Sequence, residues 1–180
     1  MDAKRVRGGL LAAGAAFVAV LVVALLLFFV SGDEADLSYR SVDFDAQLQS
    51  NGDIKFTEHL DYQLKRREND DGDTKPWKQL YLTFKLRNQD LTNITDISVT
   101  NASTGEEYTQ TDPQLPSGIS DGTWDSPYAG HWYIADTTAG SDSPQPFDPT
   151  TDGIDPNGSG EQKNIEIGWN IPATVKQSSL

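Results

Sequence analysis

Apolar residues fill one uninterrupted stretch near the start of the chain, residues 10–30, which contains no charged or polar side chain. A helix of this length rises about 31 Å, which matches the hydrocarbon core of a bilayer. Three basic residues precede the stretch and acidic residues follow it: Lys4, Arg5 and Arg7 before, and Asp33, Glu34 and Asp36 after. Since the positively charged flank stays in the cytoplasm, the pattern predicts a cytoplasmic tail over 1–9, a transmembrane helix over 10–30 and an acidic spacer over 31–38.

The alternative for residues 10–30 is a cleaved signal peptide, whose apolar region usually spans about 7–15 residues. The longer run here favours a retained anchor in the lipid bilayer. In contrast, Ser31 and Gly32 are small residues directly after Val30, and they offer a cleavage site. Both interpretations place the rest of the chain outside the cytoplasm. The expected location is therefore the plasma membrane, with a single span, or the extracellular space if the signal is removed.

Beyond the spacer the hydrophobic pattern changes to alternation with a period of two, which is typical of a strand with one buried face. Residues 42–48 alternate in this way, and residues 54–64 repeat the pattern after Asn51-Gly52, a pair favoured in hairpin turns. The second segment places Ile54, Phe56, Leu60, Tyr62 and Leu64 on one face. We expect a β-hairpin here.

Shorter β-type segments recur at 80–86, 97–108, 132–134 and 165–171, the last closed by Pro172. Residues 139–160 contain four prolines and few apolar side chains, which predicts a long exposed loop. No segment beyond residue 30 shows a helical period. Residues 39–180 are therefore expected to form one extracytoplasmic, all-β domain, an antiparallel β-sandwich of about seven strands.

The charge of the chain limits the classes of molecule that it is expected to bind. The formal net charge is −13, and 26 acidic but only 11 basic residues follow the apolar stretch. Such a surface repels phosphate backbones, so nucleic acid is not an expected partner. The absence of cysteine from the sequence excludes disulfides, thiolate zinc sites and a cysteine nucleophile.

Four short segments resemble a known family: Tyr39-Arg40-Ser41-Val42, Asn51-Gly52-Asp53-Ile54-Lys55-Phe56-Thr57-Glu58, Leu60-Asp61-Tyr62 and Ile165-Glu166-Ile167-Gly168-Trp169-Asn170-Ile171-Pro172. They resemble the N-terminal extracytoplasmic region of the YciQ-like predicted membrane proteins of bacteria, a family of unknown function, in its actinobacterial versions. The resemblance implies an exported β-rich domain on a membrane protein and supplies no catalytic residues. Because family members continue into further membrane segments, the chain resembles either a fragment or a shortened relative.

Glu58 is the most unusual charged residue, because its place in the alternation puts it on the apolar face of residues 54–64. A buried carboxylate must be paired or take up a proton. It could thus act as an acid with a raised pKa, pair with Arg87 or Arg40, or turn outward at a bulge. We favour a structural role. With no serine nucleophile elbow and no glycine-rich phosphate loop, the sequence does not predict an enzyme.

Aromatic residues crowd one short span, and they are candidates for sugar stacking: Trp124, Tyr128, Trp132 and Tyr133. The same residues could instead fill the core of a small sandwich, which we favour. Acidic loops are candidates for calcium. Asp148 and Asp152 imitate the start of an EF-hand loop but lack its terminal glutamate, and Asp70 and Asp73 form a second cluster. No other cofactor is expected.

These observations favour a membrane-tethered extracytoplasmic module without catalytic activity, which binds or organises a protein or glycan of the bacterial cell envelope. The alternative is a carbohydrate-binding module that uses exposed aromatic side chains.

Overall fold

The computed structural model describes residues 36–88, 90–175 and 177–178. In this part of the chain the elements follow in the order β1 (Leu37–Leu48), β2 (Ile54–Leu64), β3 (Trp77–Arg87), β4 (Thr100–Asn101), β5 (Glu106–Glu107), β6 (Thr109–Gln110), α2 (Asp121–Asp125), β7 (His131–Asp136), β8 (Gln145–Pro146), β9 (Gln162–Thr174) and β10 (Gln177–Ser178). The predicted tail, transmembrane helix and most of the spacer lie outside these residues. Within them, no helix has the length and apolar character needed to cross a membrane.

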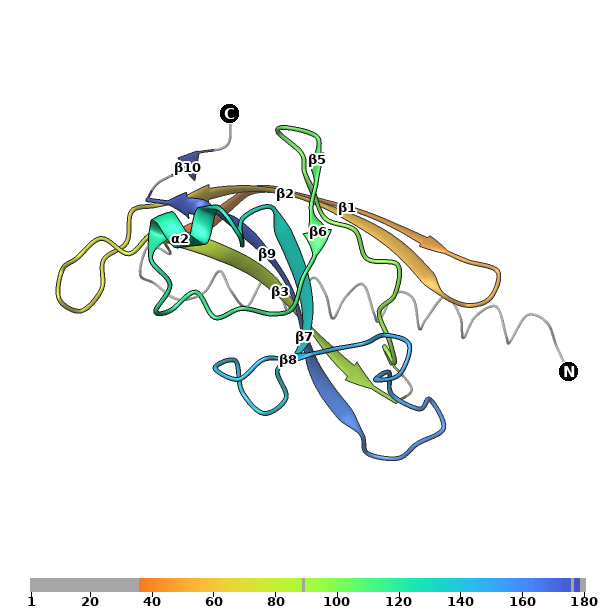
Figure 1. The fold of residues 1–180 in the computed structure, drawn as a ribbon. Coiled ribbons are helices and arrows are strands. Elements are labelled where there is room, and N and C mark those ends of the chain that lie inside the picture. The colour runs from red at the N-terminus through yellow and green to blue at the C-terminus, as the bar shows by residue number, and fades with distance from the viewer. Residues whose placement is uncertain (1–35, 89, 176, 179–180) are drawn as a thin grey trace, which may run out of the picture. The chain divides into compact units, whose positions relative to one another are not determined.

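The strands form three sheets (Figure 1). The first has the order β1-β2-β10, the second has the order β3-β9-β7-β6 with β8 paired to β7, and the third joins β4 to β5. All pairings are antiparallel except that of β6 with β7. The predicted all-β class is therefore confirmed, with one parallel pair that the alternation does not reveal.

The β1–β2 hairpin forms where the sequence predicts it, with a register that runs from Leu37 opposite Leu64 to Leu48 opposite Ile54. Its turn is a three-residue loop closed by two backbone bonds: the Gly52 amide donates to the Gln49 carbonyl, and the Gln49 amide donates to the Asp53 carbonyl. Gly52 has φ 100°, which glycine adopts without strain, and this explains the Asn-Gly pair.

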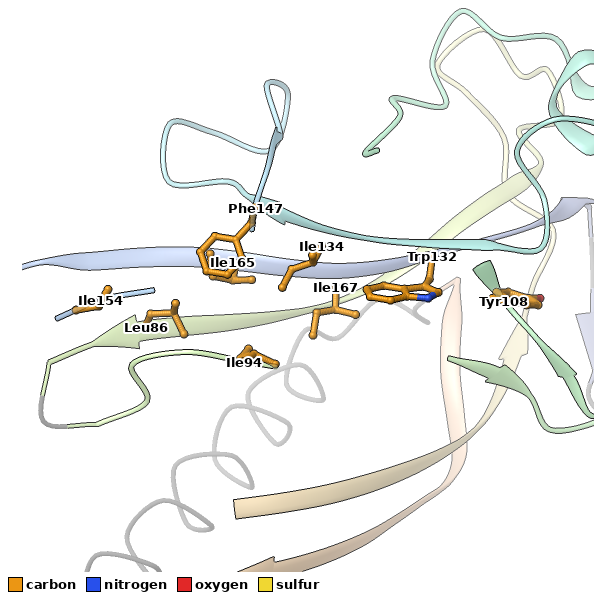
Figure 2. Packing of buried hydrophobic residues seen from close by; sticks show 9 residues of the cluster. All are labelled: Leu86, Ile94, Tyr108, Trp132, Ile134, Phe147, Ile154, Ile165 and Ile167. Carbon is orange, nitrogen blue, oxygen red and sulfur yellow. The ribbon is translucent and has the colours of Figure 1, made fainter. Parts of the chain in front are cut away.

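Strand β9 lies at the centre of the five-stranded sheet, between β3 and β7. One of its faces carries Ile165, Ile167, Trp169 and Ile171, the alternation seen in the sequence. This face builds the main core with side chains from β3, β7 and the loops, shown in Figure 2: Leu86, Ile94, Tyr108, Trp132, Ile134, Phe147, Ile154, Ile165 and Ile167. A second cluster, Leu64, Trp77, Leu80 and Ile171, packs β2 against β3 and β9 and so joins the first two sheets.

Two expectations for the C-terminal half need correction. The proline-rich stretch 139–160 is not simply an exposed loop, because Phe147 and Ile154 are 3% and 4% exposed and anchor it to the core. Pro172 does not end the last strand, because β9 continues to Thr174. The proline is tolerated since it lies in a register shift, where three β9 residues oppose one residue of β3.

Candidate functional site

The face of the five-stranded sheet opposite the core carries a ladder of polar residues. The pairings of β3, β9 and β7 place them in three rows across the sheet: Gln79–Asn170–His131, Tyr81–Gly168–Tyr133 and Thr83–Glu166–Ala135. Asn170 is fully buried, and its Oδ1 accepts a hydrogen bond from Gln79 Nε2 at 3.0 Å. Its Nδ2 finds no hydrogen-bond partner among the described residues. This face is therefore buried at Asn170, although its composition is polar, and it is exposed at Tyr81 and Thr83 of β3.

Tyr133 and Glu166 form a buried pair in the middle of the ladder. The Tyr133 hydroxyl donates to Glu166 Oε1 at 2.5 Å, and the two residues are 1% and 8% exposed. The ring reaches this position because residue 168 is glycine: a Cβ there would lie 2.1 Å from Tyr133 Cζ. Gly168 is thus required by the close approach of the Tyr133 ring to the β9 backbone.

The electrostatics of the pair follow from its burial. Burial raises the pKa of the Tyr133 hydroxyl, and the hydrogen bond to Glu166 raises it further, so Tyr133 remains a proton donor. Burial also raises the pKa of the Glu166 carboxyl, while the hydrogen bond donated by Tyr133 opposes that shift. The pair therefore holds a carboxyl group in a fixed position on this face, one row from Lys85.

Next to this pair lies a cavity of about 350 Å³. Its polar lining comes from β3, β9 and the loop after β7: Tyr81, Thr83, Lys85, Thr137, Ser141, Asn164 and Glu166. Tyr81 is 54% exposed at this cavity. The arrangement offers hydrogen-bond donors and acceptors beside one accessible aromatic ring.

The second notable surface is the apolar face of the β1–β2 hairpin. Figure 1 shows the turn end of β1 and β2 extending beyond the strands of the five-stranded sheet. Phe44, Leu48 and Ile54 on this face are 41%, 62% and 38% exposed. The Phe44 and Phe56 rings stack at 5.7 Å, and Phe56 contacts Phe84 of β3 at 6.2 Å. Part of the face is therefore packed against β3, and its outer part is open.

Glu58 lies on this same apolar face, as its position in the alternation predicts, directly opposite Phe44. Burial raises the pKa of its carboxyl. The bulge in the hairpin falls at Arg40, between Tyr39 and Ser41, so it does not turn Glu58 outward. Arg87, one of the two expected partners, lies 3.9 Å from Asp90 instead. Glu58 is thus a half-buried carboxyl on a mostly apolar face.

The four aromatic residues singled out for sugar stacking do not form an exposed platform. Trp124, Trp132 and Tyr133 are 0%, 7% and 1% exposed, and only Tyr128 is partly accessible. Trp124 is held by a hydrogen bond from its Nε1 to the Ile171 carbonyl at 2.9 Å. These side chains fill the fold, because a domain with few aliphatic residues uses aromatic ones for its core.

The acidic loops use their carboxylates for local hydrogen bonds. Asp148 Oδ1 accepts from the amide and hydroxyl of Thr150, and Asp152 Oδ2 accepts from the Asp148 amide. Both aspartates line a cavity of about 550 Å³, whereas Asp70 and Asp73 lie in the exposed loop before β3. Among the residues that the structure describes, no three histidine, cysteine or acidic side chains converge as metal ligands.

Sequence reasoning missed Glu166 and Tyr81. Both alternate with the apolar residues of their strands, so the pattern assigns them to an ordinary polar face. Gly168 lies between Ile167 and Trp169 in β9. A glycine inside a strand often marks a place where another group approaches the backbone closely, and here that group is the Tyr133 ring.

One of the comparisons with known proteins identifies a family. Residues 38–178 match the N-terminal domain of a family described as predicted membrane proteins, DUF2207. No curated protein and no solved structure matches the chain. The matched region covers most of the sequence and nearly all of the described residues. The chain therefore belongs to this DUF2207 family of predicted membrane proteins, and it contains the family's N-terminal domain.

Proposed function

We propose that this protein is a membrane-tethered, non-catalytic binding module of the bacterial cell envelope, in which the β1–β2 hairpin captures an extended segment of a second envelope protein. Residues 10–30 would anchor it in the plasma membrane as a single span, with the β-domain outside the cytoplasm. The basic residues before that stretch and the acidic residues after it support this orientation. The segments around Tyr39, Asn51 and Ile165 support a relationship to the YciQ-like, actinobacterial type.

The observation that carries the proposal is the open apolar face of the hairpin. Every residue from Asp43 to Leu48 is exposed, including Phe44 and Leu48. β1 is also the edge strand of its sheet, so one row of its backbone amides and carbonyls has no neighbouring strand in that sheet. An exposed edge with adjacent apolar side chains is the surface that β-strand addition uses.

The charges on β1 indicate the chemistry of the partner. Asp43 and Asp45 alternate with Phe44 and Ala46, so they project from the opposite face of the strand. A strand added to the edge of β1 would extend both faces of the sheet. Its apolar side chains would lie beside those of the apolar face, and its side chains on the other face would lie beside these aspartates. Lysine or arginine at those positions would pair with them, whereas a second copy of β1 would bring more aspartate close to Asp43 and Asp45. We therefore expect a segment in which basic and apolar residues alternate.

Binding of synthetic peptides to the full chain in lipid nanodiscs tests this proposal. The probe is an extended peptide of alternating lysine and valine, and the matched control replaces each lysine by glutamate. We expect saturable binding of the lysine peptide, weakened by salt, and none of the glutamate peptide. Asp43→Asn with Asp45→Asn should reduce the affinity at least tenfold.

Two leucine variants separate the hairpin from non-specific attraction. Leu48→Ser should weaken binding several-fold because it removes apolar area from the hairpin face, while Leu115→Ser, at an exposed leucine outside the sheets, should not. Equal binding of the two peptides, or equal effects of the two leucine variants, would refute the proposal.

A further inference from the structure

We infer that the outer face of the five-stranded sheet binds a neutral, hydroxyl-rich ligand, of the size of one pyranose ring, by stacking on Tyr81 and hydrogen bonding within the adjacent cavity. The site is formed by β3, β9 and the loop after β7, and none of its residues belongs to the hairpin. The inference is therefore independent of the partner proposed for β1.

Tyr81 supplies the stacking surface. It lies on β3 opposite Gly168, in the same row as Tyr133, and it is 54% exposed whereas Tyr133 is buried. The glycine leaves no side chain between the two tyrosines on this face. An exposed aromatic ring at the edge of a polar cavity can cover the C–H face of a sugar ring while the hydroxyls at the ring's rim stay near polar partners.

The cavity supplies those polar partners. Thr83, Thr137 and Ser141 offer hydroxyls, Asn164 offers an amide, and Glu166 offers a carboxylate. Its volume of about 350 Å³ lies at the lower end of small-molecule sites, which suits a single ring. Polar groups from three separate segments that converge on one small space can bind several hydroxyls of one ligand.

Glu166 is already held in place before any ligand arrives. Its Oε1 accepts a hydrogen bond from the Tyr133 hydroxyl, and the residue is 8% exposed, so the orientation of its second oxygen is restricted. Prior ordering of a polar group lowers the entropy cost of binding. A carboxylate is a strong acceptor for hydroxyl groups, which a sugar presents in series.

The charges of the site favour a neutral ligand. Its lining contains one cation, Lys85, and one anion, Glu166, at neighbouring rows of the same sheet. An anionic ligand would be attracted by Lys85 but repelled by the buried carboxylate of Glu166. A cationic ligand would be attracted by Glu166 but repelled by Lys85. A polyhydroxyl ligand can donate to Glu166 and accept from Lys85 without this conflict.

Titration of cellotriose into the full chain in lipid nanodiscs tests the inference, with saturation-transfer NMR and calorimetry as readouts. Cellotriose is the chosen probe because its ring hydroxyls are equatorial and both ring faces carry C–H groups. We expect saturable binding in the millimolar range. Tyr81→Ala should abolish it, and Thr83→Val, which keeps the side-chain shape but removes the hydroxyl, should weaken it several-fold.

The matched control is Phe44→Ala, which removes an exposed aromatic ring from the hairpin and should leave sugar binding unchanged. A charged analogue, glucose 6-phosphate, should bind more weakly than glucose itself. Absence of saturable binding, or binding that survives Tyr81→Ala, would overturn the inference. Since the peptide assay depends on Asp43, Asp45 and Leu48, failure of one proposal leaves the other intact.

Discussion

Replacing Gly168 by alanine tests the packing that holds Glu166 in place. The added Cβ would lie 2.1, 2.2 and 2.3 Å from Tyr133 Cζ, Oη and Cε1, and real Cβ atoms essentially never approach that closely. The ring must therefore move, and its hydroxyl then loses Glu166. Since Gly168 does not have a positive φ, the backbone contributes no strain of its own.

The expected cost has two parts. Insertion of a methyl group into a well-packed site costs about 1–3 kcal/mol, and loss of a hydrogen bond to a charged group costs about 1.5–3 kcal/mol. Together they predict a loss of about 2.5–6 kcal/mol in the free energy of unfolding. For a domain of this size the melting temperature should fall by roughly 10–20 °C.

A double-mutant cycle with Tyr133→Leu separates steric conflict from other effects. Leucine lacks the three ring atoms that the new Cβ would meet, so Gly168→Ala should cost much less in that background, with a coupling of more than about 1 kcal/mol. Gly122→Ala is the control, because nothing lies within 4 Å of a Cβ there and alanine favours the helix α2. A Gly168→Ala loss below about 0.5 kcal/mol, measured by chemical denaturation, would refute the packing argument.

Three further substitutions test the electrostatics and the core. Burial raises the folded-state pKa of Glu58, so its contribution to stability is present below the unfolded-state pKa and is lost as the pH rises through the folded-state pKa. Glu58→Gln should therefore raise the melting temperature at neutral pH and lose this advantage in acid; a gain that is the same at both pH values would contradict the assignment. Trp124→Phe removes the donor to the buried Ile171 carbonyl and should cost about 1–3 kcal/mol in chemical denaturation, whereas a cost near zero would show that the bond is replaced. The Asp148 amide lowers the pKa of Asp152, so this stabilisation is present above the unfolded-state pKa and is lost as the pH falls. Melts of Asp152→Asn should differ from those of the natural chain at neutral pH and converge with them in acid; a difference that persists in acid would count against this hydrogen bond as the cause.

Local patterns predicted the elements whose partners are close in sequence. The β1–β2 hairpin follows from alternation on both sides of Asn51-Gly52, and the structure pairs residues 42–48 with 54–60 as expected. The pairing continues to Leu37 and Leu64, beyond the first predicted segment. The β-type segment predicted at 97–108 contains a second hairpin, β4 and β5, which turns between Asn101 and Glu106 with Gly105 at φ 74°. In both cases, turn chemistry and side-chain period act over a few residues and can be recognised without the rest of the chain.

The site on the outer face depends on contacts that no local pattern encodes. Glu166 is polar and alternates with isoleucine, which in isolation indicates a solvent-facing position. It is buried because Tyr133 from β7 folds over Gly168, and that contact requires the pairing of β7 with β9. The four crowded aromatic residues were compatible in sequence with a sugar-stacking surface or with the core, the interpretation we favoured, and only packing shows that three of them are buried.

The pairing of β3 with β9 also sets the order in which the domain can assemble. Arg87 pairs with Gln162 and Trp77 with Thr174, so the partners are 75 to 97 residues apart. Closing such a loop is slow compared with forming the β1–β2 hairpin, which needs about 1–10 μs once its residues are free. During synthesis, the hairpin can therefore fold long before Thr174 emerges. The edge of β1 becomes available to a partner strand early, whereas the cavity beside Tyr81 exists only after β9 has docked.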